Sequence, residues 1–167
     1  MNKLIGVGVL SVLISSGAQA LSLEGAWSLQ DADNTQVKLD AAVEDVVKEI
    51  NFFIRALARP VLEKETQICN TWLLATDTTQ FLWQCDDNPP GELALNANSS
   101  EMMSDDGRLI VGTLKKTDNR ISTILESERG KRTNVWQIVS ENEMHYTTTL
   151  ESDKIPKPLT WTLTYTR

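Results

Sequence analysis

The sequence has few of the side chains that bind metals or carry out catalysis. It contains one histidine and two cysteines among 167 residues. Histidine nitrogens and cysteine thiolates are the usual ligands of structural and catalytic zinc, so we expect no metal site of that type. We find no glycine-rich phosphate loop, and no nucleophile can be matched with a base and an orienting carboxylate. We therefore expect no metal and no other cofactor, we assign no catalytic residue, and an enzyme is the less favoured function.

Positive charge is also scarce. The chain has 16 Lys and Arg residues against 23 Asp and Glu residues, a net charge of −7. An acidic surface repels nucleic-acid phosphates, and this excludes nucleic acid as a general partner. Acidity is compatible with a protein partner of opposite charge.

Long apolar runs are absent after the first twenty residues. The segment Leu4–Ile14 is uncharged, follows Lys3, and leads into the small-residue pattern Ala18-Gln19-Ala20. It is too short to span a bilayer, which needs about 20 residues. This order of features is typical of a signal peptide. We predict that residues 1–20 are removed and that 21–167 form one soluble domain without a transmembrane segment, exported to the periplasm or secreted.

The two cysteines, Cys69 and Cys85, predict a disulfide. An isolated pair in an oxidising compartment usually forms a bridge. If a hairpin turns at Asp77, the two cysteines face each other across antiparallel strands, where opposite side chains are close enough to be joined. A redox-active pair is more often Cys-x-x-Cys, which is absent. The expected bridge is structural.

The hydrophobic pattern changes along the chain. Apolar residues first recur at helical spacing, which predicts one amphipathic helix over about 40–62, with Asp40 as its N-cap. Pro60 predicts a kink or break in that helix. Residues 31–36 and 96–106 are polar and are expected to be connections. Around the helix we expect nine strands, at about 23–30, 67–75, 79–86, 91–96, 108–116, 120–128, 132–140, 143–151 and 158–166.

The last expected strand alternates most clearly. Leu159, Trp161, Leu163 and Tyr165 share one face, and threonines occupy the other. Such alternation indicates an antiparallel sheet with one buried and one solvated face. The predicted fold class is mainly β: an antiparallel meander that curls into a barrel or half-barrel, with one amphipathic, Pro-kinked helix inserted after the first strand.

Gly25-Ala26-Trp27 lies on the first expected strand, and Arg167 follows the last one. This arrangement resembles the calycins, the group of lipocalins and fatty-acid-binding proteins. The resemblance implies that Trp27 packs against Arg167 and closes one end of a barrel, a contact favoured by the attraction between a guanidinium and an indole face. The helical segment after the first strand is more similar to that of a fatty-acid-binding protein.

Two groups of residues are candidates for ligand binding. Lys48, Phe52, Arg55 and Arg59 lie on one side of the expected helix, where they would form either a clamp for an anionic headgroup or an ordinary solvated face. The second group is aromatic and either lines an apolar cavity or fills a solid core. Its members are Trp72, Trp83, Trp136, Tyr146 and Trp161.

Two functions follow from these patterns. The first is a periplasmic or secreted binding protein for an apolar or amphipathic, lipid-like small molecule held in the barrel. The alternative is an exported, non-enzymatic module that binds or inhibits another protein through its acidic loops. The amphipathic helix over aromatic-rich strands favours the first, and the negative net charge favours the second.

Overall fold

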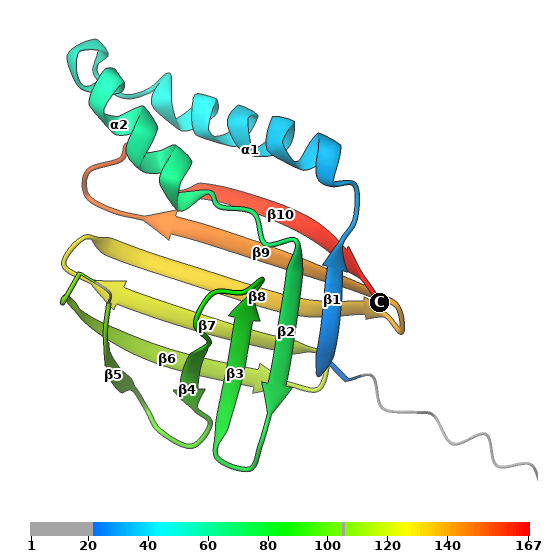
Figure 1. Cartoon of the computed structure of the whole chain (residues 1–167). Coiled ribbons are helices and arrows are strands. Elements are labelled where there is room, and N and C mark those ends of the chain that lie inside the picture. The colour runs from blue at the N-terminus through cyan, green and yellow to red at the C-terminus, as the bar shows by residue number, and fades with distance from the viewer. Residues whose placement is uncertain (1–21, 105) are drawn as a thin grey trace, which may run out of the picture.

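The computed structural model describes residues 22–104 and 106–167, and the predicted signal peptide lies outside this part of the chain. One strand is followed by two helices and then by nine further strands (Figure 1). The elements are β1 (Gly25–Leu29), α1 (Ala32–Val47), α2 (Phe52–Glu65), β2 (Thr71–Thr76), β3 (Gln80–Cys85), β4 (Gly91–Ala94), β5 (Ser100–Met103), β6 (Leu109–Thr117), β7 (Arg120–Ser127), β8 (Gly130–Ser140), β9 (Glu143–Glu151) and β10 (Leu159–Thr166).

The strands form one 10-stranded sheet in the order β4-β3-β2-β1-β10-β9-β8-β7-β6-β5. All neighbouring strands are antiparallel, and the two edges are β4 and β5, which follow one another in the chain. In Figure 1 the strands β1 to β4 run across the direction of β6 to β10, so the sheet curls over itself. The side chain of Leu93 on β4 reaches Gly112 on β6 across the unpaired edges. The predicted antiparallel barrel is confirmed.

The alternation predicted for the last strand is also confirmed. Leu159, Trp161, Leu163 and Tyr165 are all buried. The threonines between them face outward, and Thr162 forms a hydrogen bond of 2.8 Å with Thr147 of β9. Burial of one face and hydration of the other give this strand a single register, because a slip of one residue would exchange the two faces.

The helical segment differs from the prediction of one helix over 40–62. α1 begins at Ala32, and its cap residue Asp31 accepts hydrogen bonds from the Asn34 amide at 3.0 and 2.9 Å. Asp, Asn and Thr compete with helical hydrogen bonds through their side chains, which is why the sequence of this first turn resembles a connection. α1 packs on β10, and both helices lie together at one end of the barrel (Figure 1).

The helical segment breaks at residues 48–51 and not at Pro60, and the predicted kink at Pro60 stays a prediction. Asn51 caps α2 by accepting a hydrogen bond from the Phe53 backbone N–H at 3.1 Å, and Asn is a preferred N-cap residue. Arg55 donates to the backbone carbonyls of Ile50 and Lys48, groups that would otherwise lack partners after the end of α1. Pro60 lies inside α2. No helix in the described ranges has the length and apolar composition needed to cross a membrane.

One strand was not predicted. β5 lies within the segment 96–106 that was expected to be a polar loop, and it pairs with β6 from Ser100–Gly112 to Met103–Leu109. This strand is short, none of its residues is buried, and none is β-branched. Its sequence, Ser-Glu-Met-Met, therefore lacks both sequence signals of a strand, the apolar–polar alternation and the β-branched or aromatic composition.

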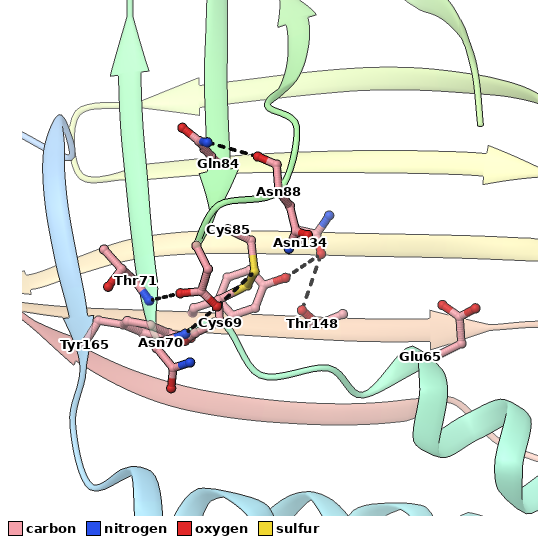
Figure 2. The surroundings of a disulfide bond; sticks show 12 residues. Glu65, Cys69, Asn70, Thr71, Gln84, Cys85, Asn88, Asn134, Thr148 and Tyr165 are labelled. Carbon is pink, nitrogen blue, oxygen red and sulfur yellow. Dashed lines mark hydrogen bonds between the residues drawn. A yellow bond between two sulfur atoms is a disulfide. The ribbon is translucent and has the colours of Figure 1, made fainter. Parts of the chain in front are cut away.

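The disulfide between Cys69 and Cys85 is confirmed, with a Cα–Cα distance of 5.2 Å (Figure 2). The predicted register of the hairpin was wrong, because Trp72 is the residue opposite Cys85 and Cys69 precedes β2. Thr76 pairs with Phe81, so the turn comprises residues 77–80 and is not centred on Asp77. Asp86 follows Cys85 and holds the backbone beside the bridge. It has a left-handed backbone with φ of 49°, and its carboxylate accepts hydrogen bonds from the backbone N–H groups of Asn70 and Thr71 at 3.2 and 2.8 Å.

The contact expected between Trp27 and Arg167 is present. The guanidinium carbon lies 4.4 Å from the centre of the indole ring, and Trp27 is completely buried. The Trp27 N–H donates to the Leu23 carbonyl at 2.8 Å, and Arg167 donates to the Glu141 carbonyl at 2.9 Å. These bonds join the first strand to the β8–β9 turn and fix one end of the barrel.

Candidate functional site

The inner face of the barrel is dominated by aromatic rings. Trp136 on β8 is completely buried, and its ring centroid lies 5.3–6.0 Å from those of four other rings. Edge-to-face and tilted contacts at such distances are favourable for aromatic pairs. The rings are in mutual contact, so they form the packed centre of the core. The four neighbours are Trp72, Phe81, Trp83 and Tyr146.

A small polar cluster lies beside these rings. The Asn134 side-chain oxygen accepts hydrogen bonds from the Tyr146 hydroxyl at 2.9 Å and from the Thr148 hydroxyl at 3.3 Å. The Asn134 amide donates to Thr123 at 3.2 Å. All four residues are buried (Figure 2 shows Asn134 and Thr148). Buried polar groups are tolerated when they are hydrogen-bonded, as these are.

Strand register produces the cluster. Thr123, Asn134, Thr148 and Trp161 are direct partners on β7, β8, β9 and β10, so they form one row across the inner face. We call this the Asn134 row. Trp136 lies two residues after Asn134 on the same strand and therefore points to the same side.

Three buried indole N–H groups have no hydrogen-bond partner among the described residues. They belong to Trp72, Trp136 and Trp161, which are 5%, 0% and 7% exposed. A buried donor without an acceptor costs about 1–3 kcal/mol. Two of them, Trp136 and Trp161, adjoin or belong to the Asn134 row. The interior therefore combines apolar walls with donors that have capacity for an additional acceptor.

One cation lies at the rim of this interior. Arg132 is two residues before Asn134 on β8, and it donates to the backbone carbonyl of Glu65 at 2.6 Å and to its carboxylate at 3.2 Å. Glu65 is the last residue of α2, so this pair ties the helix to the barrel. Within 22–104 and 106–167, the buried polar residues are all uncharged.

Burial controls the ionisation of both tyrosines in the chain. Desolvation raises the pKa of Tyr146, against smaller lowering effects of the neighbouring Thr148 hydroxyl and the charge of Arg132. Desolvation also raises the pKa of Tyr165, whose hydroxyl donates to the Cys69 carbonyl at 2.8 Å. Both hydroxyls therefore stay protonated at a higher pH than the hydroxyl of an exposed tyrosine.

These shifts predict a loss of stability at alkaline pH. The unfolded chain releases the tyrosine protons near pH 10, whereas the folded protein retains them. The free energy of unfolding contributed by this difference is fully present below about pH 10, and it falls above that pH by up to about 1.4 kcal/mol per pH unit for each tyrosine. Urea unfolding between pH 8 and 11.5 measures it.

Tyr165→Phe is the matched control, because lysines titrate equally in both proteins. Above about pH 10 the free energy of unfolding of the variant is expected to fall less steeply with pH than that of the wild type, because one buried tyrosine no longer contributes. Tyrosinate absorbance that develops near pH 10 in the folded wild type would contradict the burial of these hydroxyls.

The structure separates the two predicted groups of ligand-binding residues. The aromatic group lies on the inner face of the barrel: Trp72, Trp83, Trp136, Tyr146 and Trp161. The helix group does not meet it. Phe52 is 76% exposed, and Arg59 pairs with Glu44 at 2.6 Å. Arg55 is held by the backbone carbonyl of Lys48. The role of this helix group in anion binding stays a prediction.

The Asn134 row and Arg132 were not predicted as site residues. One signal was present, since Asn134 has the same parity as the inward-facing Trp136 and Ile138 on its strand. A polar residue at a core position needs a buried partner. Its partners lie on other strands, and their register is not apparent from the sequence of β8 alone. No group of three or more acidic, histidine or cysteine side chains suited to a metal ion occurs in the described part of the chain.

No family model and no curated protein matches the sequence. Solved structures do match. A fatty-acid-binding protein from the brain of Drosophila melanogaster is 13% identical, with 87% of this chain and 100% of that chain covered at a TM-score of 0.52. A Schistosoma mansoni fatty-acid-binding protein in complex with arachidonic acid is 16% identical, with 89% and 98% covered and a TM-score of 0.52. A secretory abundant heat-soluble protein from Ramazzottius varieornatus is 14% identical, with 87% and 94% covered and the same TM-score of 0.52. The chain thus has a calycin-like fold.

Proposed function

We propose that this protein is an exported binding protein that holds an apolar or amphipathic, lipid-like small molecule inside its barrel. The observation that carries the proposal is the set of buried indole N–H groups without acceptors in an otherwise apolar interior. A ligand with an apolar body would replace contacts between rings, and its polar end would accept the free hydrogen bonds. Ligand sites in proteins usually have this composition, mostly apolar with a few polar groups.

The fold supports the same proposal. The Schistosoma mansoni protein with this fold is described in complex with arachidonic acid, and the Drosophila melanogaster one as a fatty-acid-binding protein. Binding inside the present barrel requires its packed rings to move, because the rings around Trp136 are in contact. The unpaired edges β4 and β5 offer a route, since they share no backbone ladder.

The proposed location is the periplasm or the extracellular space. Two observations support it: the leader-like pattern of residues 1–20 and the disulfide between Cys69 and Cys85. Disulfides persist in oxidising compartments and are rare in the cytosol. N-terminal sequencing of the exported protein is expected to begin at Leu21, and an intact Met1 on exported material would contradict this.

Titration with Nile red, an uncharged dye that becomes fluorescent in apolar surroundings, tests the proposed function. We expect one saturable site of about micromolar affinity, or about −8 kcal/mol, with energy transfer from tryptophan. The absence of saturable binding to delipidated protein would contradict the proposal.

A surface variant separates binding inside the barrel from binding to α2. Phe53 and Leu57 of α2 are 86% and 75% exposed and form an apolar outer face. The double variant Phe53→Ser, Leu57→Ser is expected to bind Nile red with unchanged affinity. If binding is lost, the dye occupies the helix surface, and a protein-binding module becomes the better-supported function.

A further inference from the structure

We infer that the polar end of the ligand is an uncharged hydrogen-bond acceptor, a carbonyl such as that of a ketone or an ester, and not a carboxylate. This inference rests on the proposed function and specifies the chemistry of that same site. It follows from the balance of donors and acceptors in the barrel, from the distribution of charge, and from the position of the free donors.

The interior has more donors than its own acceptors use. The Asn134 oxygen already accepts two hydrogen bonds, and the Asn134 amide donates to Thr123. The indole N–H groups of Trp136 and Trp161 remain without partners in the described chain. An indole nitrogen can only donate, so the complementary ligand group must accept. A carbonyl oxygen accepts and brings no further donor, whereas an alcohol adds one.

The charge of the interior disfavours a carboxylate. Among the described residues, the buried polar side chains on the inner face are neutral: Thr123, Asn134 and Thr148. Transfer of an unpaired carboxylate into such surroundings is very unfavourable. The cation at the rim is already engaged, because Arg132 binds both the backbone carbonyl and the carboxylate of Glu65. A carboxylate ligand near Arg132 would also be repelled by Glu65.

The free donors lie on the same inner face of the sheet. Trp161 is the fourth member of the Asn134 row, and Trp136 occupies the adjacent row, paired with Tyr146. Strand β9 separates the two, so two strand spacings of about 5 Å and a row offset of about 7 Å place their Cα atoms about 12 Å apart on one face. A carbonyl oxygen can accept a hydrogen bond from an indole N–H, and its two lone pairs leave capacity for a second donor. The Asn134 row and Trp136 thus define the subsite for the polar end.

Competition against Nile red with three twelve-carbon compounds tests the inference. At pH 8 we expect 2-dodecanone to displace the dye at about a tenfold lower concentration than dodecane, since one hydrogen bond changes affinity by up to about this factor. Dodecanoate is expected to require a concentration at least about tenfold higher than 2-dodecanone. Tighter binding of dodecanoate than of 2-dodecanone would overturn the inference and leave the proposed function intact. If none of the three displaces the dye and the dye itself does not bind, the proposed function fails.

Variants locate the acceptor. Trp136→Phe and Trp161→Phe retain an aromatic ring and remove the N–H, so each is expected to reduce the preference for 2-dodecanone over dodecane several-fold. Trp27→Phe is the matched control, because the Trp27 N–H already donates to the Leu23 carbonyl at 2.8 Å and its ring lies at the closed end of the barrel, against Arg167. The ratio of the two affinities is insensitive to a general loss of stability. An unchanged ratio in both variants would overturn the inference.

A spectroscopic measurement needs no substitution. In infrared spectra, the C=O stretching band of bound 2-dodecanone is expected at lower frequency than in hexane, because a hydrogen bond to the oxygen weakens the C=O bond. A band at the hexane frequency would show that the carbonyl accepts no hydrogen bond and would overturn the inference.

Discussion

Replacement of Trp136 by Ala is expected to lower the free energy of unfolding by about 3–5 kcal/mol, the usual range for loss of a buried aromatic side chain. Trp136 is completely buried, and it lies in contact distance of four other rings, so its removal leaves a cavity that rigid neighbours fill poorly. Urea unfolding followed by circular dichroism measures the change, because two of the remaining fluorophores, Trp72 and Trp83, report on the same site.

The matched control is Val139→Ala on the same strand. Val139 is 49% exposed on the outer face, and its truncation is expected to change stability by less than about 0.5 kcal/mol. A loss below about 1 kcal/mol for Trp136→Ala would contradict a packed aromatic centre. It would indicate instead that the barrel interior is loosely filled in solution.

Removal of the disulfide is expected to cost about 3 kcal/mol. The bridge joins residues separated by 16 positions. In the chain-entropy model, closure of a loop of this length lowers the conformational entropy of the unfolded state and so stabilises the fold by about 3 kcal/mol. The bridge also fixes the backbone at Cys69, whose carbonyl accepts the buried Tyr165 hydroxyl. The double variant Cys69→Ser, Cys85→Ser therefore removes the restraint on the unfolded chain and weakens the buried hydrogen bond between Tyr165 and the Cys69 carbonyl.

Unfolding with and without dithiothreitol separates these effects. The wild type is expected to lose about 3 kcal/mol on reduction, and the double serine variant is expected not to respond to the reductant. Equal stability of the oxidised wild type and the double variant would contradict a structural role of the bridge.

The strand pattern could be predicted because it depends on local alternation. The buried residues of β10, from Leu159 to Tyr165, and the outward threonines are apparent from a period of two. That feature requires only knowledge of which face of a strand is buried. The contact between Trp27 and Arg167 was predicted in another way, from the resemblance of Gly25-Ala26-Trp27 and the terminal arginine to the calycins.

Features set by single backbone contacts could not be predicted. α1 starts at Ala32, where the Asp31 carboxylate accepts hydrogen bonds from the Asn34 side-chain amide, although the same residues are common in turns. The hairpin turns at 77–80, where the Asp77 carboxylate accepts hydrogen bonds from the Thr79 and Gln80 backbone N–H groups, and this turn sets a register different from the one predicted. In both places one side chain accepts backbone or amide hydrogens in a geometry that composition does not reveal.

The site was only half predictable for a related reason. The aromatic group, including Trp136 and Tyr146, could be identified from residue type and strand parity. The Asn134 row depends on the alignment of β7, β8, β9 and β10, and each alignment is fixed by turns and by a bulge between Ile138 and Ser140. Register across several strands is a property of the folded sheet, so the hydrogen-bonded cluster became visible only in the structure.

The central claim is that a small molecule binds inside the barrel, beside the free indole donors. The indole N–H resonances of the five tryptophans, followed by ¹⁵N–¹H NMR during titration with 2-dodecanone, test it most directly. We expect the Trp136 and Trp161 resonances to shift most, because they gain an acceptor. The Trp27 resonance is expected to stay in place, because its N–H already donates to Leu23 at 2.8 Å. Unshifted Trp136 and Trp161 resonances at saturating 2-dodecanone would contradict the claim.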